Sequence, residues 1–257
     1  MDLLTILSVE SSKGDKIMEK GDKLEHVGII MDGNRRWADK SGFQRLLGHN
    51  KGADVFVDTC NWCIKRNIDF LTVYAFSTEN WKRSQEEVVH IFKLMEKFFT
   101  DKIGLCIERG IKINVIGERI VKEKGLSAEN ITVIENAEKK TEYCNNLRVQ
   151  IALNYGGRNE IVRAAIKMSN DIASGKLIIK TIDEKVFEKY LDTNGIPDVQ
   201  LVIRTGGIEN SRLSNFLPWQ VVYSELYFSE LLWPEFTEYE FDKAIAYYHS
   251  VQHKIGK

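Results

Sequence analysis

The sequence predicts a single α/β domain with a mostly parallel central sheet, and three observations lead to that prediction. Short apolar or β-branched segments alternate with longer amphipathic segments along most of the chain. No Pro-, Gly- or Ser-rich linker interrupts this alternation, and the 257 residues include only three prolines. The strand candidates are apolar throughout, as is typical of parallel strands that are buried on both faces. We therefore expect one sheet of about six strands flanked by helices.

The elements follow one another in a regular order. The expected strands cover residues 27–31, 70–75, 111–116, 148–153, 199–204 and 226–228. Helical periodicity covers residues 48–66, 85–102, 128–144, 159–174, 184–191 and 238–253. Capping boxes begin two of these helices, at Ser84 and Thr237, and Gly175 ends a third. Residues 1–23 carry mixed Lys, Ser and Gly residues and predict a flexible N-terminal arm, which leaves 24–257 as the folded domain.

Composition excludes several classes of protein. The net charge is −1, so the chain has no global basic field of the kind that binds nucleic acid, and any anion site must be built locally. No apolar run approaches the ~20 residues of a transmembrane helix, and the N-terminus has no signal-peptide pattern. We expect a cytoplasmic protein, for which a peripheral contact with the membrane stays open.

The four cysteines are too few for a disulfide framework in a chain of this length. Cys60 and Cys63 have the C-x-x-C spacing of redox sites, but they lie inside a helical pattern with no preceding active-site strand. No second pair is available to complete a zinc site. These thiols are predicted to be buried and inert.

The segment Asp32-Gly33-Asn34-Arg35-Arg36-Trp37 directly follows the first strand. Gly33 allows a positive φ or a close approach to a ligand, and the amides of such a turn form a concave anion site at a helix start. Arg36 can hold phosphate with two hydrogen bonds, and Asp32 can hold a divalent cation against that phosphate. The segment indicates a diphosphate site with Mg²⁺. The alternative is an ordinary strand-to-helix turn whose charges face water.

Three further strand ends carry residue types that bind phosphate. Ser77 to Arg83 follows the second strand, Asn154 to Arg158 the fourth, and Thr205 to Asn215 the fifth. Because ligands of such sheets bind beyond the carboxyl ends of the strands, these segments are expected to converge on one site.

The blocks HVGIIMDGNRRWA, LTVYAFSTENWKRS, ALNYGGRNEI and RLSNFLPWQVVYSELYFSELLWPEF resemble, in this order, the signature blocks of the cis-prenyltransferase family. The resemblance spans about residues 24 to 253. It implies a homodimeric, non-Rossmann α/β enzyme that uses Mg²⁺ to condense isopentenyl diphosphate onto an allylic diphosphate such as farnesyl diphosphate, with new Z double bonds. An undecaprenyl-type product, the precursor of a cell wall lipid carrier, is the leading expectation. The aspartate-rich DDxxD pair of the unrelated all-helical synthases is absent from this sequence.

The resemblance also implies roles for individual residues. Asp32 and Asn80 match catalytic positions, and Asp32 and Glu225 match carboxylates at the metal. Matches to the allylic diphosphate site are Gly33, Asn34, Arg35, Arg36, Trp37, Arg45, His49, Ser77, Trp81 and Arg83. Matches to the isopentenyl diphosphate site are Arg204, Arg212 and Ser214. Glu87 matches a family position as well, although its place in the capping box of Ser84 would also account for it.

The sequence departs from the family pattern in the fourth block. Eight positions separate Arg204 from Arg212, where the family has six, and Gln200 stands where an acid is usual. The longer loop either bulges outward and leaves Arg212 in place, or it re-aims the donor clamp. The role of Glu209 in this loop is the assignment most affected.

A growing prenyl chain requires an apolar tunnel. The segment after Ser84 places six apolar side chains on one broad helical face, and Ala75 and Ile151 would face them from the sheet. The six are Val88, Ile91, Phe92, Met95, Phe98 and Phe99. We expect this face to be core on one flank and tunnel wall on the other.

Two other functions stay open on the sequence alone. The same fold could make a short, branched or cyclised prenyl diphosphate, and the longer loop keeps that alternative in play. A non-catalytic accessory subunit that binds prenyl lipid would be expected to have lost the metal and phosphate ligands, which are present here. Neither nucleotide-binding glycine motif, G-x-x-x-x-G-K-[ST] or G-x-G-x-x-G, occurs.

Overall fold

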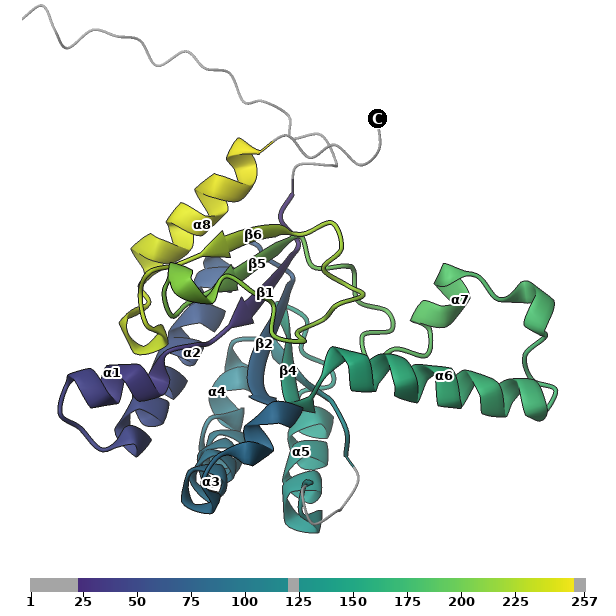
Figure 1. The fold of residues 1–257 in the computed structure, drawn as a ribbon, viewed down its shortest axis with the longest axis horizontal. Helices are drawn as coiled ribbons and strands as arrows, with labels where there is room; N and C mark the ends of the chain where they lie inside the picture. Colours follow the sequence, from purple (N-terminus) through teal and green to yellow (C-terminus); the bar gives the residue numbers. More distant parts are fainter. Residues whose placement is uncertain (1–22, 120–124, 252–257) are drawn as a thin grey trace, which may run out of the picture.

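The computed structural model describes residues 23–119 and 125–251 of the chain. Its centre is a six-stranded sheet with the strand order β3-β4-β2-β1-β5-β6, in which every pairing is parallel (Figure 1). The strands are β1 (His26–Ile30), β2 (Phe70–Ser77), β3 (Ile111–Ile116), β4 (Leu147–Tyr155), β5 (Leu201–Arg204) and β6 (Glu225–Phe228). The predicted parallel α/β sheet of about six strands is confirmed.

Eight α-helices and four short 3₁₀ turns connect the strands within the described residues. The helices are α1 (Asn34–Lys40), α2 (Arg45–Lys65), α3 (Gln85–Asp101), α4 (Ile103–Glu108), α5 (Ala128–Lys140), α6 (Gly157–Ala173), α7 (Glu184–Glu188) and α8 (Glu238–Ser250). The 3₁₀ turns are η1 (Thr78–Lys82), η2 (Ile179–Thr181), η3 (Ile208–Asn210) and η4 (Trp233–Glu235). Helix α1 is the helix that the turn at Gly33 was expected to start, although no range was predicted for it, and the six-residue helix α4 was not predicted.

The predicted N-terminal arm lies outside the described residues except for Lys23, and so does the end of the last predicted helix beyond residue 251. Part of the segment between β3 and α5 is likewise outside the description.

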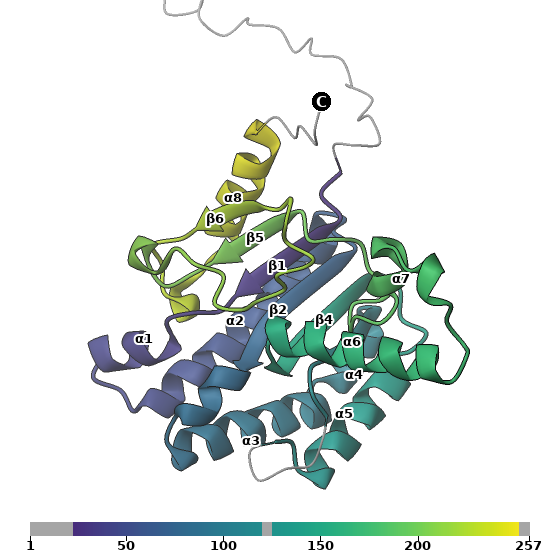
Figure 2. The same cartoon turned by 45° about the vertical axis from the view of Figure 1, so that its right-hand side comes forward.

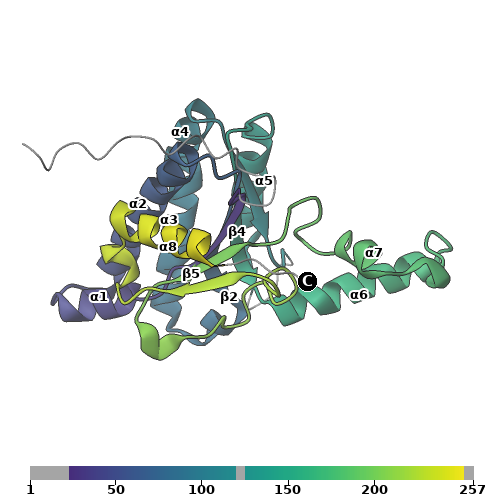
Figure 3. The same cartoon turned by 90° about the horizontal axis from the view of Figure 1, so that it is seen from above.

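The main hydrophobic core lies between one face of the sheet and the helices α2, α3, α5 and α8 (Figure 3). A smaller core on the other face packs Ile30 and Val202 against Phe216 and Leu217, which belong to the loop before β6. Helices α6 and α7 project from the body of the molecule (Figure 1). Two apolar residues of α6, Val162 and Ile166, are each 56% exposed.

The strand register brings the segments of interest to one edge. Ile30 of β1 is level with Tyr74 of β2 and with Arg204 of β5. All strands point the same way (Figure 2), so the segments that follow β1, β2, β4 and β5 leave the sheet on the same side. The predicted convergence of the carboxyl-end segments is thus present in the fold.

Gln200, the departure from the family pattern before β5, lies at the opposite edge. Its Oε1 accepts hydrogen bonds from the backbone N–H groups of Glu25 and His26, at 2.6 and 3.1 Å, and its Nε2 donates to the carbonyl of Lys23. An acid could not make this last donation. Gln200 therefore stabilises the start of β1 and lies far from the carboxyl ends of the strands.

The cysteines behave as predicted. Cys60, Cys63 and Cys106 are buried and none of the four is in a disulfide. Burial raises the pKa of the Cys60 and Cys63 thiols well above the ordinary value, which keeps them protonated and unreactive. Within the part of the chain that the structure covers, no helix has the length and apolar character needed to cross a membrane.

Candidate active site

Asp32 is the centre of a charged cluster where β1 and β5 end. Its Oδ1 lies 3.0 Å from Nη2 of Arg36, and its Oδ2 accepts a hydrogen bond from Nη2 of Arg204 at 2.8 Å. Thr205 holds the backbone at this point, because its Oγ1 accepts from the Asp32 N–H and donates to the Asp32 carbonyl. One partly exposed carboxylate is thus fixed between two guanidinium groups.

Two glycines with left-handed backbone make this cluster possible. Gly33 has φ 115° and precedes α1, and a Cβ there would lie 2.9 Å from Leu232. Gly206 has φ 104°, and a Cβ there would lie 2.5 Å from the Arg36 guanidinium and 3.0 Å from Asp32. Arg36 also donates to the carbonyl of Gly206. A side chain at Gly206 would displace the charged groups, and one at Gly33 would clash with Leu232.

Asn34 lies at the boundary between the charged cluster and the apolar interior. Its Oδ1 is buried and has no hydrogen-bond partner. Gly48 and Gly52 of α2 let this helix approach closely, since a Cβ at either position would meet an Asn34 oxygen within 2.5 Å. An orphaned buried acceptor is costly, which is a reason to expect a ligand donor at this position.

Glu87 links three cationic or polar residues of the predicted allylic site. Its Oε1 accepts from Nη1 of Arg83 at 2.8 Å and lies 3.3 Å from Nε2 of His49, and its Oε2 is 3.7 Å from Nε of Arg35. The Glu87 N–H does donate to Ser84 Oγ, but the carboxylate turns to these three side chains instead of capping the helix. The sequence left these two roles undecided; the geometry places the Glu87 carboxylate against Arg83, His49 and Arg35, and its part in substrate binding stays a prediction.

His49 is held neutral at this position. Burial, and after it the nearby charge of Arg83, lower the pKa of His49 to about 4 against the opposing effect of Glu87. Its ring therefore serves as a neutral hydrogen-bonding group beside Glu87, and the ring also lines the apolar pocket described below.

In the segment after β2, Asn80 and Trp81 both make contacts within the protein. Asn80 accepts a hydrogen bond from the Ser77 N–H at 3.1 Å and so shapes the η1 turn. Trp81 was predicted to contact the allylic diphosphate, but its indole stacks on Phe92 and its Nε1 donates to Asn154 Oδ1 at 2.7 Å. The indole N–H is used inside the protein, so Trp81 supports the loop, and its contact with the allylic substrate stays a prediction.

Two other predicted allylic contacts lie at the edge of the site. The Trp37 ring packs against Phe43 with 5.8 Å between ring centroids. Arg45 begins α2 and pairs with Asp39 at 3.0 Å, with both side chains about half exposed. An exposed pair of this kind is weak enough for a phosphate to replace Asp39.

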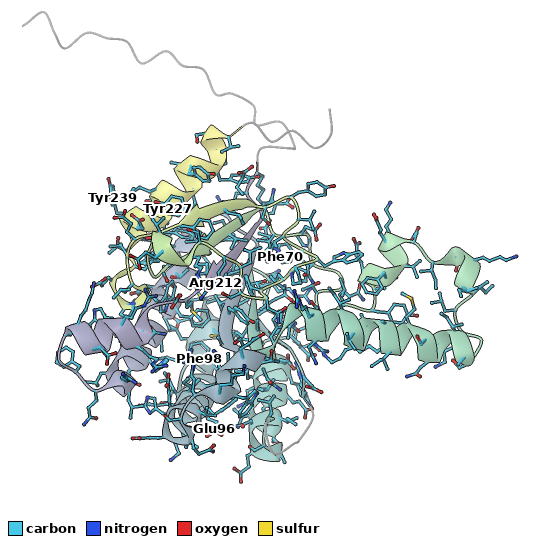
Figure 4. The ribbon with its side chains drawn as sticks, viewed as in Figure 1. Phe70, Glu96, Phe98, Arg212, Tyr227 and Tyr239 are labelled. Carbon is cyan, nitrogen blue, oxygen red and sulfur yellow. The ribbon has the colours of Figure 1, made fainter. Side chains whose placement is uncertain are left out.

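The donor clamp is partly assembled. Arg204 is buried, its Nη1 donates to Ser214 Oγ at 2.7 Å and to the carbonyl of Arg212, and its Nε has no partner. The two extra residues form the outward η3 turn, in which Ile208 is 57% exposed. The backbone at Arg212 therefore stays anchored to Arg204, while the Arg212 guanidinium is exposed. Figure 4 labels Arg212 among the side chains at the front of the molecule.

Glu225 does not join Asp32. The parallel register pairs Glu225 with Leu201 at the amino end of β5, whereas Arg204 is level with Phe228. At about 3.3 Å per residue, this puts Glu225 on the order of 10 Å below the edge that carries Asp32. Asp32 and Glu225 of the same chain are therefore too far apart to share a metal ion. The resemblance implies that Glu225 acts close to a dimer interface, and that role stays a prediction.

The residues at the edge fit Mg²⁺ only together with a substrate. Among the described residues, no three His, Cys, Asp or Glu side chains gather as a metal site. Mg²⁺ is commonly bound by one or two carboxylates together with substrate phosphates, and the partly exposed Asp32 beside two guanidiniums suits that donor set.

An apolar pocket of about 120 Å³ opens beside Asn34 and His49. Helices α2 and α3 and strands β2 and β4 form its walls, with Ala75 and Ile151 on the sheet side. On α3 its lining includes Ile91, Met95, Phe98 and Phe99. Val88 and Phe92 are instead buried in the core. The same helix thus serves as core and as pocket wall, as predicted.

The fold and the site together define a parallel α/β protein in which a carboxylate, several guanidiniums and an apolar pocket meet at one sheet edge. The family model described as undecaprenyl diphosphate synthase matches residues 30–256. The chain therefore belongs to this family of cis-prenyltransferases and is a prenyl-transferring enzyme.

Individual relatives agree with this assignment. An isoprenyl transferase of Aquifex aeolicus is 42% identical over 91% of this chain and 96% of its own length. A tritrans,polycis-undecaprenyl-diphosphate synthase (geranylgeranyl-diphosphate specific) of Pyrococcus horikoshii is 43% identical over 91% of this chain and 87% of its own. Lavandulyl diphosphate synthase of Lavandula x intermedia, solved with dimethylallyl diphosphate, superposes with a TM-score of 0.85 at 32% identity, covering 91% of this chain and 98% of that one.

Proposed function

We propose that this enzyme condenses isopentenyl diphosphate repeatedly onto an allylic diphosphate, farnesyl diphosphate, with Mg²⁺, and makes an undecaprenyl-type Z-polyprenyl diphosphate for a cell wall lipid carrier. One observation carries the proposal: the Asp32, Arg36 and Arg204 cluster adjoins an apolar pocket across the unpartnered Asn34 oxygen. Such an arrangement suits two charged heads and one growing hydrocarbon tail.

The reaction breaks the allylic C1–O bond and forms a bond between that C1 and the terminal C4 of isopentenyl diphosphate. Arg36, with Arg35 and Arg83 gathered by Glu87, is placed to stabilise charge on the departing diphosphate. Mg²⁺, bound by Asp32 and diphosphate oxygens, would add further stabilisation of that charge. Arg204, Ser214 and Arg212 would hold the second diphosphate so that the two carbons meet at reacting distance.

A proton must also leave C2 of the isopentenyl unit. His49 is neutral and its low pKa makes it a weak base. An oxygen of the departing diphosphate is a suitable acceptor, since it gains charge as the C1–O bond breaks, and a contact linked to Asn34 is an alternative route.

The apolar pocket supports binding of the prenyl tail. Each buried CH₂ contributes about 0.8 kcal/mol, so tail burial would supply much of the substrate affinity. A cavity of about 120 Å³ is close to the size that accepts a benzene ring. A long product would therefore require the α2 and α3 walls to move apart as the chain grows.

Exposed apolar residues support the expected homodimer. Val162 and Ile166 of α6, and Val222 and Tyr223 before β6, are all more than half exposed. Val162 and Ile166 are four positions apart and so share one face of α6, and exposed apolar surface of this kind is common at interfaces. A role for Glu225 at the metal of a second copy stays a prediction, as do the cytoplasmic location and a peripheral membrane contact for product release.

A second product class is favoured by one comparison. Lavandulyl diphosphate synthase, solved with dimethylallyl diphosphate, superposes closely on this chain, and the small pocket would suit a short prenyl diphosphate. The accessory-subunit alternative is disfavoured, because Asp32, Arg36 and Arg204 are present and in mutual contact.

The test is to incubate the protein with Mg²⁺, labelled isopentenyl diphosphate and either farnesyl or dimethylallyl diphosphate, and to size the products. A ladder that ends near eleven isoprene units supports the main proposal. A single short product supports the second class. No incorporation with either allylic substrate, at any Mg²⁺ concentration, would contradict both.

A further inference from the structure

Asn215 connects three segments at the carboxyl edge of the sheet. Its Oδ1 accepts from the Arg158 N–H at 2.9 Å, and its Nδ2 donates to Glu79 Oε1 at 3.0 Å. Its own carbonyl accepts from the Gly157 N–H at 2.8 Å. One residue thus joins the loop before β6 to the segments that follow β2 and β4.

The backbone here is held in an unusual conformation. Ser214, Asn215 and Leu217 have φ of 50°, 67° and 47°, although none is glycine. Non-glycine residues adopt this left-handed region at a cost, and such residues persist where surrounding contacts fix them. Asn is the side chain that tolerates it best.

The contact between Asn215 and the segment after β2 is tightly packed. A Cβ on Gly156 would lie 2.6 Å from Thr78 Oγ1 and 2.9 Å from Asn215 Nδ2. Burial alone would raise the pKa of Glu79, but hydrogen bonds from its own backbone and from Asn215 keep it below the ordinary value. The Asn215–Glu79 bond therefore joins an amide donor to a carboxylate.

The two ends of this connection belong to different substrate sites in the proposed function. Ser214, next to Asn215, accepts a hydrogen bond from Arg204 of the donor clamp. Glu79 lies in η1, between Ser77 and Arg83 of the allylic site. The Asn215 side chain thus ties Glu79 and the Arg158 amide to the donor loop, and the Asn215 carbonyl ties the Gly157 amide to it.

We propose that Asn215 is a positioning residue that fixes the isopentenyl diphosphate clamp relative to the allylic site, through its bonds to Glu79 and Arg158. The inference rests on the proposed function for its kinetic consequences. Asn215 does not contact the reacting atoms and acts through Ser214 and the η1 turn.

The first test replaces Asn215 by glycine, which accepts the left-handed backbone but lacks the amide. We expect the KM for isopentenyl diphosphate to rise about tenfold while the KM for farnesyl diphosphate changes less than about twofold. Hydrogen exchange of the Arg158 amide should accelerate. The matched control is Asn67→Gly, because Asn67 also has a left-handed backbone, φ 53°, but follows α2 at the other edge of the sheet.

The second test exchanges donor and acceptor in the hydrogen bond between residues 215 and 79. Asn215→Asp places two carboxylates together and should impair the donor KM at least as much as Asn215→Gly. Combining it with Glu79→Gln restores one donor and one acceptor across the same contact, so the double variant should recover most of the wild-type KM.

Several results would overturn the inference. One is an Asn215→Gly enzyme that matches Asn67→Gly in both KM values, another is an equal loss of affinity for both substrates, and a third is a double variant no better than Asn215→Asp alone. If the wild-type protein shows no condensation at all, the proposed function fails instead, and the hydrogen-exchange comparison still tests the connection.

Discussion

Asp32 carries two ion pairs at once, to Arg36 and to the buried Arg204. Because its oxygens are already engaged, a metal ion and a diphosphate must share or replace these partners when they bind. In the proposed function, one carboxylate would serve where other prenyl synthases use two aspartate-rich segments, because the guanidiniums would bind phosphate and leave Asp32 to hold the cation.

Replacing Asp32 by alanine should lower turnover by about a thousandfold, because charge on the departing diphosphate loses its metal ion. Farnesyl diphosphate should still bind within a few-fold of wild type, since its other contacts remain. Steady-state kinetics and a fluorescence titration measure the two effects. Asp58→Ala, an exposed carboxylate on α2, is the control, and turnover like that of wild type in Asp32→Ala would refute the metal role.

At the residue scale the sequence predicted which charged and polar residues gather at the site better than it predicted the partners of single side chains. Asp32, Arg36, Arg204 and Ser214 are brought together as expected. Glu87 was ambiguous because a glutamate three positions after a serine suits a capping box as well as a site. For Trp81 the motif did not reveal that the indole N–H donates to Asn154 of β4.

At the scale of elements, α3 has a double role. Phe92 stacks on Trp81 and packs at a tilt against Phe76. Phe98 lines the pocket and also borders an outer groove between α2 and α3. Both flanks are apolar, so the periodicity predicted one broad face without distinguishing core from cavity. Only the packing of α2 against α3 separates the two.

Phe98→Ala should extend the products by several isoprene units, because the side chain separates the pocket from the outer groove. Truncation enlarges the cavity at a cost in stability, which the partial exposure of Phe98 keeps below the ~3–5 kcal/mol of a fully buried phenylalanine. Sizing the labelled products measures the effect. Val89→Ala, on the exposed side of the same helix, is the control and should leave the product distribution unchanged. An unaltered distribution in Phe98→Ala would contradict the proposed barrier between pocket and groove.

The η3 turn is the second element with a specific prediction. Deleting Ile208 and Ser211 restores the six-residue spacing and removes an exposed turn that is closed by hydrogen bonds from Ser211 to the Ile208 carbonyl. We expect the KM for isopentenyl diphosphate to shift about fivefold while allylic affinity stays intact. Kinetics with each substrate varied in turn is the measurement, and an equal loss for both would show that the loop is not specific to the donor.

At the scale of the whole molecule, His26 ties the sheet together from within. Its Nδ1 is 2.7 Å from the Pro197 carbonyl, and its Nε2 is 2.8 Å from Thr72 Oγ1, which also accepts from Gln150. Strands β1, β2 and β4 are thus joined through one imidazole. Burial lowers its pKa to about 4, against backbone hydrogen bonds that raise it.

This depressed pKa predicts how stability depends on pH. In the unfolded chain His26 is protonated below about pH 6.5, whereas in the folded protein it stays neutral down to about pH 4. The free energy of unfolding should therefore fall as the pH drops from 6.5 to 4, by on the order of 3 kcal/mol for this residue. Above pH 6.5 His26 is neutral in both states, so it does not change the free energy of unfolding with pH.

Urea unfolding of wild type and His26→Gln at pH 7 and pH 5 checks this prediction. The variant should be less stable at pH 7 but should lose less stability on acidification. His49, whose pKa is also about 4, remains in both proteins, so the difference between the two slopes isolates His26. Parallel slopes would contradict the prediction.

The sequence alone determined the class of fold, the edge of the sheet that carries the site, and most of the charged residues there. Apolar strands, helix caps and the segments that follow each strand are local features, and in a parallel sheet their order along the chain already implies a common edge. The tertiary structure decided what depends on distances between remote residues. It separated Glu225 from Asp32 by strand register, turned Glu87 toward Arg83 and His49, and joined Asn215 to Glu79. These contacts link positions from 4 to more than 100 residues apart, and side-chain packing rather than local pattern selects them.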